Sequence, residues 1–191
     1  MRHTTAIVLY AIFLLLSVPV GTLCHEVIGH GAVGILAGGR VVDVEVHGVQ
    51  LWPTIGWNGW PERWGGCEVT GVSTPTGNTL VSLGGSVSTW VVAAAAVSLL
   101  WIRRWRGWMR IVLICCSLWW FDLLTYTLPS WGLKRYVLFG NRFQEPYDAA
   151  VNLGIPGPIF QALVVAGCLL LVVALLVRLR CDSLVATSSS P

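Results

Sequence analysis

Four long runs of apolar residues constrain this chain more than any other feature of its sequence. Each run is about as long as a helix must be to cross the hydrocarbon core of a bilayer, which takes roughly 20 residues. The sequence therefore predicts an all-α polytopic membrane protein of about four transmembrane helices, which span residues 4–37, 79–102, 109–128 and 155–179.

The composition supports this class of protein. Hydrophobic residues make up 55% of the 191 residues and charged residues only 11%, whereas soluble domains carry roughly a quarter charged residues. Four spans leave room for a single integral membrane domain, residues 1–182, and for no separate soluble domain. The polar residues 183–191 are expected to form a disordered tail.

The basic residues lie beside the spans and do not form a patch that would bind nucleic acid. Arginines crowd the link at 103–110, close the last span at 178–180, and precede the first span as Arg2. An even number of spans places these three groups on one side, which the positive-inside rule identifies as the cytoplasm. We therefore expect a multi-pass protein of the plasma membrane, surrounded by the lipid bilayer, with N and C termini in the cytoplasm.

The segment after the first span is expected to lie at the outer membrane surface. Residues 42–47 alternate between apolar and polar with the period of two that is typical of a half-buried strand, and 68–73 is a candidate returning strand. The intervening stretch is rich in tryptophan, a residue that favours the membrane interface. The sequence predicts a small interfacial β-hairpin within residues 40–76.

One motif at the outer end of the first span carries candidate chemistry: His25-Glu26-Val27-Ile28-Gly29-His30. In zinc hydrolases, two imidazoles one helical turn apart bind one Zn²⁺, and a glutamate beside the first acts as general base. Ionisable side chains within a membrane span are costly to bury and usually functional. The motif therefore makes His25, Glu26 and His30 candidate site residues.

The spacing of this motif, H-E-x-x-x-H, has one residue more than the usual H-E-x-x-H. Positions five apart lie roughly 140° apart around a regular helix, against roughly 40° for positions four apart. A π-bulge with i→i+5 hydrogen bonds would realign His25 with His30, and Gly29 would ease that distortion. From spacing alone, a metal site and a pair of interfacial histidines bonded to backbone or water are equally consistent with the motif.

The motif and the residues after it resemble the site-2 protease group, the M50-like membrane metalloproteases. Those proteins show H-E-x-G-H-A, several apolar residues, a Gly-Gly-Arg-Val-like turn and then a strand. The corresponding turn here is Gly38-Gly39-Arg40-Val41, and a Gly-rich second helix follows at Leu83-Gly84-Gly85. Small residues at the latter position are also expected to let two helices approach closely.

The resemblance implies that His25 and His30 bind Zn²⁺ and that Glu26 is the general base. The third ligand of the family is an aspartate from an L-D-G string, which this chain lacks. Asp148, at the mouth of the last span, is preferred because it precedes an alanine, as in shorter members of the family. Asp122, inside the third span, is the competitor, and whichever aspartate does not bind the metal is expected to hydrogen-bond to a ligand.

The leading prediction is a zinc-dependent intramembrane endopeptidase, a metalloprotease that hydrolyses peptide bonds of membrane-embedded protein or peptide substrates. The strand at 42–47 is a candidate edge strand that would hold the substrate in an extended form. The alternative is a catalytically inactive M50-like scaffold or partner-binding protein. A haem or ion-handling protein is less favoured, since no other predicted span contains a histidine.

Overall fold

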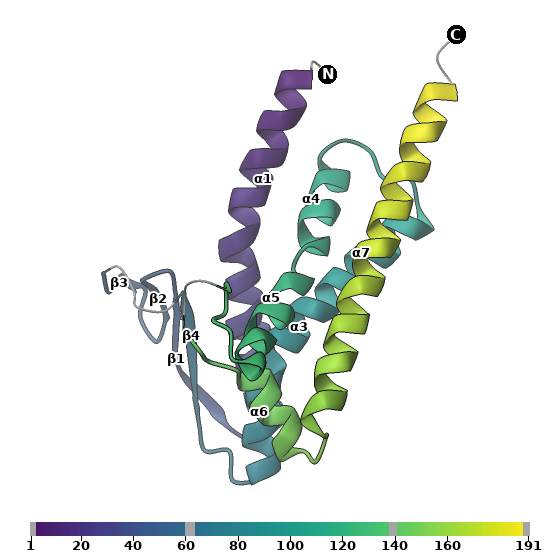
Figure 1. The fold of residues 1–191 in the computed structure, drawn as a ribbon. Coiled ribbons are helices and arrows are strands. Elements are labelled where there is room, and N and C mark those ends of the chain that lie inside the picture. The colour runs from purple at the N-terminus through teal and green to yellow at the C-terminus, as the bar shows by residue number, and fades with distance from the viewer. Residues whose placement is uncertain (1–2, 60–63, 138–140, 189–191) are drawn as a thin grey trace.

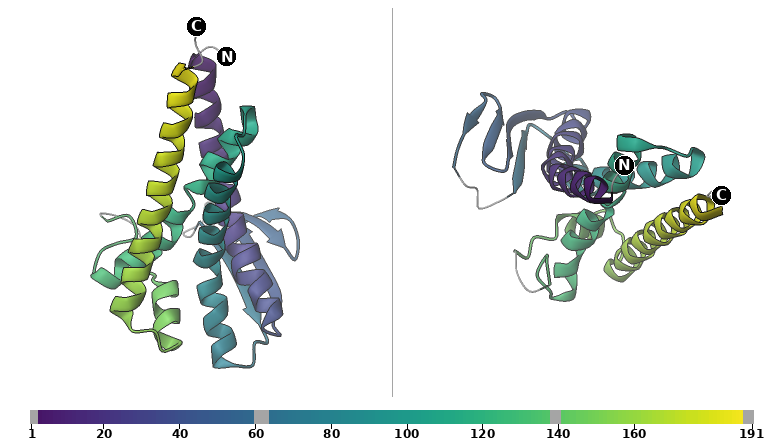
Figure 2. Two further views of the ribbon diagram at one scale, coloured as in Figure 1. Left: turned by 90° about the vertical axis from the view of Figure 1, so that its right-hand side faces the viewer. Right: turned by 90° about the horizontal axis from the view of Figure 1, so that it is seen from above.

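The structure, a computed structural model, describes residues 3–59, 64–137 and 141–188. Within these residues, four helical segments are long and apolar enough to cross a membrane: Ile7–Leu36, Pro75–Ile102, Gly107–Trp131 and Gly157–Asp182. The first begins and the last ends at the same end of the bundle, as an even number of crossings requires (Figures 1 and 2). The prediction of an all-α polytopic membrane protein is confirmed.

The first span changes its helical form along its length. It starts as the α-helix α1 (His3–Leu23), continues as the π-helix η1 (Cys24–Ala32), and ends as the short α-helix α2 (Val33–Leu36). The chain leaves the helix at Gly38, whose φ of 85° lies in the left-handed region that glycine adopts without strain. The candidate motif therefore lies wholly within the π-helical segment.

The second span, α3 (Pro75–Ile102), begins with a Thr74 cap, whose hydroxyl accepts a hydrogen bond from the Gly77 amide at 3.0 Å. The helix packs against η1, α4, α5, α6 and α7, so it is the central element of the bundle. A β-carbon built on Gly29 would collide with the backbone of Gly84 and Gly85. The glycines of α3 therefore allow the close approach of helices that the sequence predicted.

The third span is interrupted in its middle. It consists of α4 (Gly107–Ser117), α5 (Trp120–Thr127) and the 3₁₀ turn η2 (Leu128–Trp131). Because α5 begins at Trp120, Asp122 falls in its first turn. This partly buried carboxylate lies at the same depth as the π-helix of the first span, where it contacts His25.

The last part of the chain forms two helices, α6 (Glu145–Asn152) and α7 (Gly157–Ser188). The short helix α6 lies at the end of the bundle opposite the termini (Figure 1). The prediction of a disordered tail from 183 differs from the structure, in which α7 continues to Ser188. No glycine or proline interrupts this stretch, so the helix is not forced to end earlier. Residues 189–191 lie outside the described part.

A four-stranded antiparallel sheet occupies the region predicted to be a hairpin. Its strands are β1 (Arg40–Val46), β2 (Val49–Trp52), β3 (Gly56–Trp57) and β4 (Gly65–Thr70), in the order β3-β2-β1-β4. The sheet lies to one side of the helices, next to the first span (Figures 1 and 2). The prediction that 42–47 is an edge strand is wrong, because β1 pairs with β2 on one side and with β4 on the other.

Candidate metal site

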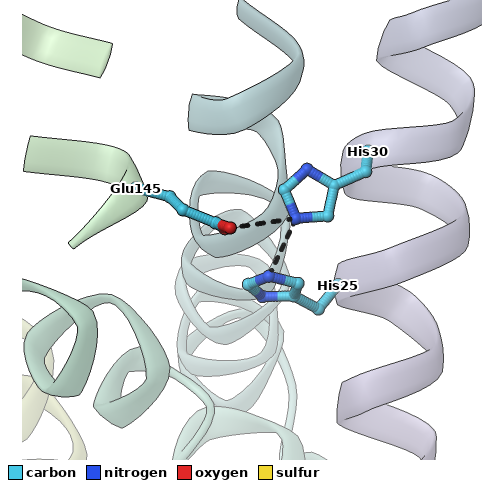
Figure 3. A group of neighbouring side chains, drawn as sticks. All are labelled: His25, His30 and Glu145. Atoms are coloured by element: carbon cyan, nitrogen blue, oxygen red, sulfur yellow. Dashed lines mark hydrogen bonds and ion pairs between the residues drawn. The ribbon is translucent and has the colours of Figure 1, made fainter. Parts of the chain in front are cut away.

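The π-helix brings His25 and His30 together on one face of the first span. Their Nε2 atoms lie 3.1 Å apart, and both side chains are buried (Figure 3). Hydrogen bonds from i to i+5 widen the helical turn, so residues five apart come into register. The structure thus has the unusual winding that the extra residue in the motif requires.

The outer nitrogen of each imidazole has a hydrogen-bond acceptor. Nδ1 of His25 donates to Oδ2 of Asp122 at 2.7 Å, and Nδ1 of His30 donates to the carbonyl oxygen of Val81, also at 2.7 Å. A neutral imidazole with its proton on Nδ1 presents a lone pair at Nε2. The two Nε2 lone pairs therefore face each other, and only a proton or a metal ion between them makes that arrangement favourable. An acceptor on the outer nitrogen is also what metal-binding histidines require.

A third ligand group comes from the opposite side of the cavity. Oε2 of Glu145, in the first turn of α6, lies 3.8 Å from Nε2 of His30, and Figure 3 shows its side chain pointing toward the two rings. One ligand atom each from His25, His30 and Glu145 lie within 4.8 Å of one another. Two imidazole nitrogens and one carboxylate oxygen form a donor set that suits Zn²⁺ with one position left open. These three residues could hold a metal ion.

Asp122, one of the two predicted aspartates, supports the site from behind His25. Its Oδ2 accepts hydrogen bonds from His25 Nδ1 and, at 2.9 Å, from the hydroxyl of Thr89. The carboxylate therefore fixes the proton position and the orientation of the His25 ring. This is the role that the sequence assigned to the aspartate that does not bind the metal.

Asp148, the preferred third ligand, is not brought to the histidines in this structure. It is exposed on α6, where its Oδ1 accepts a hydrogen bond from the Gln144 side chain at 2.8 Å. The place near the histidines that was predicted for Asp148 is instead occupied by Glu145, which lies one helical turn earlier on the same helix. The sequence carried a signal for this residue, since an acidic group in the first turn of a helix is stabilised by the helix dipole, but that signal does not distinguish a ligand from a cap.

Glu26 is also buried, beside the two histidines and under the sheet. A β-carbon on Gly65 of β4 would meet Oε1 of Glu26, so the carboxylate lies directly against this strand. The neighbouring thiol of Cys67 has its pKa raised to about 11, mainly by burial and further by the charges of Glu26 and Asp43. Burial therefore favours the neutral thiol of Cys67 at this position.

The candidate site opens into a cavity of about 1290 Å³. His25, Glu26 and His30 line it together with β4, and it extends along α1 as far as Leu14. Because Leu14 precedes His25 by 11 residues in sequence, the cavity reaches roughly 16 Å from His25, past the middle of the span toward its N-terminal end. The cavity therefore offers a polar site at one end and an apolar passage at membrane depth.

No protein-family model matches the sequence, and no curated protein or solved structure matches the chain.

The two acidic residues of α6 provide a direct test of the ligand set. We expect Glu145→Gln to weaken Zn²⁺ binding by about 100-fold or more, because loss of a direct ligand exceeds the 10- to 100-fold cost of losing an outer hydrogen-bond partner. Asp148→Asn makes the same chemical change one turn away and is expected to leave affinity unchanged. Competition with a chelator of known affinity measures both, and an equal effect of the two variants would contradict the assignment of Glu145.

Proposed function

We propose that this protein is a zinc-dependent intramembrane endopeptidase that hydrolyses peptide bonds of membrane-embedded substrates. The observation that carries the proposal is the π-helix, which directs Nε2 of the buried His25 and Nε2 of the buried His30 at each other at the wall of the cavity. Glu26, next to His25 in sequence, supplies a buried carboxylate at the same place. The resemblance of this motif to the M50-like metalloproteases supports the choice of zinc and of peptide hydrolysis.

In this proposal each residue of the chain has a distinct task. His25, His30 and Glu145 would hold Zn²⁺, which when bound supplies a Lewis acid and lowers the pKa of a coordinated water. Glu26 takes a proton from the attacking water and delivers it to the amine nitrogen as the peptide C–N bond breaks. Asp122 and the carbonyl of Val81 keep the two imidazoles oriented throughout.

The strand β4 is the part of the sheet best suited to hold a substrate. It lies at the edge of the sheet in the described part of the chain, and its residues 65–69 line the cavity beside Glu26. An extended peptide could pair with the backbone of an edge strand while its side chains alternate between the two faces. The substrate role first considered for 42–47 is therefore proposed for β4.

The orientation in the membrane is also a proposal. Arg103, Arg104 and Arg106 are exposed in the link between the second and third spans, and an even number of crossings puts this link on the side of the termini. The positive-inside rule favours a cytoplasmic location for that side of a plasma-membrane protein. The sheet and α6 would then face the outside.

Bound zinc on purified protein tests the metal site first. We expect wild type to hold one Zn²⁺ per chain and His25→Ala to hold close to none, because a single remaining imidazole and a carboxylate leave the site short of donors. His47→Ala is the matched control, since His47 contacts Thr22 and Trp64 outside the metal group. Equally little zinc in wild type and in His25→Ala would overturn the proposal.

A further inference from the structure

Arg135 lies close to the candidate metal site, although it follows the third span in sequence. Its guanidinium carbon is 3.4 Å from the centre of the Tyr126 ring, and that ring stacks on His25 with 5.3 Å between centroids and 19° between planes. A terminal nitrogen of Arg135 also lies 4.0 Å from Oδ1 of Asp122. Arg135 is therefore linked to His25 by two separate routes, one through a ring stack and one through a carboxylate.

The two oxygens of Asp122 face different partners. Oδ2 accepts from His25, whereas Oδ1 faces Arg135. At 4.0 Å the guanidinium attracts Oδ1 electrostatically without a direct hydrogen bond, so rotation of the carboxylate would weaken this attraction as well as the bond to His25. The guanidinium thus favours the orientation in which Asp122 accepts the Nδ1 proton of His25, and that orientation leaves Nε2 of His25 directed at His30.

Arg135 also balances part of the negative charge around the cavity. Among the described residues that line the cavity, Arg135 is the one arginine or lysine, against the acidic residues Glu26, Glu68, Asp122 and Glu145. Its side chain is only 15% exposed, and its Nε is buried without a hydrogen-bond partner among the described residues. Burying a guanidinium with an unsatisfied nitrogen is costly, so its position beside the candidate site points to a role beyond packing.

We infer that Arg135 is a positioning residue of the metal site: through Asp122 and Tyr126 it fixes the ring of His25 in the orientation that directs Nε2 into the ligand group. The inference rests on the proposed metal site but does not require that the site cleave peptides. It also explains why a tyrosine, with its flat ring, lies between an imidazole and a guanidinium, since both planar groups stack on aromatic faces.

The test compares Zn²⁺ affinity and the visible absorption spectrum of the Co²⁺-loaded protein across variants of this group. Arg135→Met keeps an unbranched apolar stem and removes the guanidinium with its charge. We expect about 10- to 100-fold weaker Zn²⁺ binding and a shifted Co²⁺ spectrum, since His25 is no longer held. Arg135→Lys keeps the positive charge but not the planar stack on Tyr126. Its Zn²⁺ affinity should therefore lie between that of wild type and that of Arg135→Met. Arg142→Met, at an exposed position outside the cavity lining, is the matched control and should behave as wild type.

A second pair of variants keeps the inference testable if Arg135→Met does not fold. Tyr126→Leu removes the ring stack and should shift the Co²⁺ spectrum, whereas Tyr126→Phe keeps the ring and should not. Wild-type affinity and an unchanged spectrum in Arg135→Met would overturn the positioning role. Wild type that binds zinc but cleaves no peptide would overturn the proposed endopeptidase alone, and wild type that binds no zinc would overturn both.

Discussion

Replacement of Glu26 by glutamine is expected to lower peptide hydrolysis by about 10²- to 10⁴-fold while zinc stays bound. This range is what a positioned general base contributes, and glutamine keeps the size of the side chain but cannot accept the proton from water. Glu26 is not a member of the ligand group formed by His25, His30 and Glu145. The metal content should therefore be unchanged, whereas kcat for a membrane-embedded peptide substrate should fall by this factor.

The matched control for this variant is Glu45→Gln. Glu45 lies on β1, where its carboxylate accepts a hydrogen bond from Asn58 at 3.2 Å, away from the cavity. Hydrolysis should be unchanged in that variant. If zinc binds to wild type but Glu26→Gln and wild type give the same proteolytic readout, the general-base role is wrong and a non-catalytic scaffold becomes the better interpretation of the same fold.

The local winding of the first span could be predicted because the motif itself demanded it. Two histidines five residues apart cannot bind the same metal ion on a regular helix. The hypothesis of a shared metal therefore already required i→i+5 hydrogen bonding near Gly29. The structure has a π-helix over Cys24–Ala32, which includes both histidines. This winding depends only on residues that are close in sequence, and for such residues the direction of the side chains around a helix follows from their spacing.

Neither the proposed third ligand, Glu145, nor the proposed role of Arg135 could be predicted in the same way. Glu145 and Asp148 lie on one short helix, and which of them faces the histidines depends on how α6 packs against α3 and α7. Arg135 reaches the site from an irregular segment after η2, where no periodic pattern indicates the direction of a side chain. The position of β1 in the middle of the sheet likewise depends on pairing with β4, which is more than 18 residues away in sequence.

Gly85 of α3 packs directly against both histidines, so its replacement should affect metal binding more than the stability of the fold. A β-carbon on Gly85 would collide with Nε2 of His25 and with Nε2 of His30. The rings could move away only by giving up their bonds to Asp122 and to the carbonyl of Val81, which hold them in place. We therefore expect Gly85→Ala to weaken Zn²⁺ binding by about 100-fold or more, since both outer hydrogen bonds are disturbed and each alone costs 10- to 100-fold.

Gly29→Ala is the informative counterpart, because its β-carbon points at backbone. The added methyl would meet the backbone of Gly84 and Gly85, and a main chain cannot swing aside as an imidazole can. The first span and α3 must therefore separate, at a cost of about 1–3 kcal/mol typical of overpacking. Thermal unfolding of the metal-free protein should show a clear loss of stability for Gly29→Ala and a smaller one for Gly85→Ala. Metal binding should fail in Gly85→Ala even where the protein is fully folded; retention of wild-type affinity there would mean that the space between the two imidazoles is not where the metal binds.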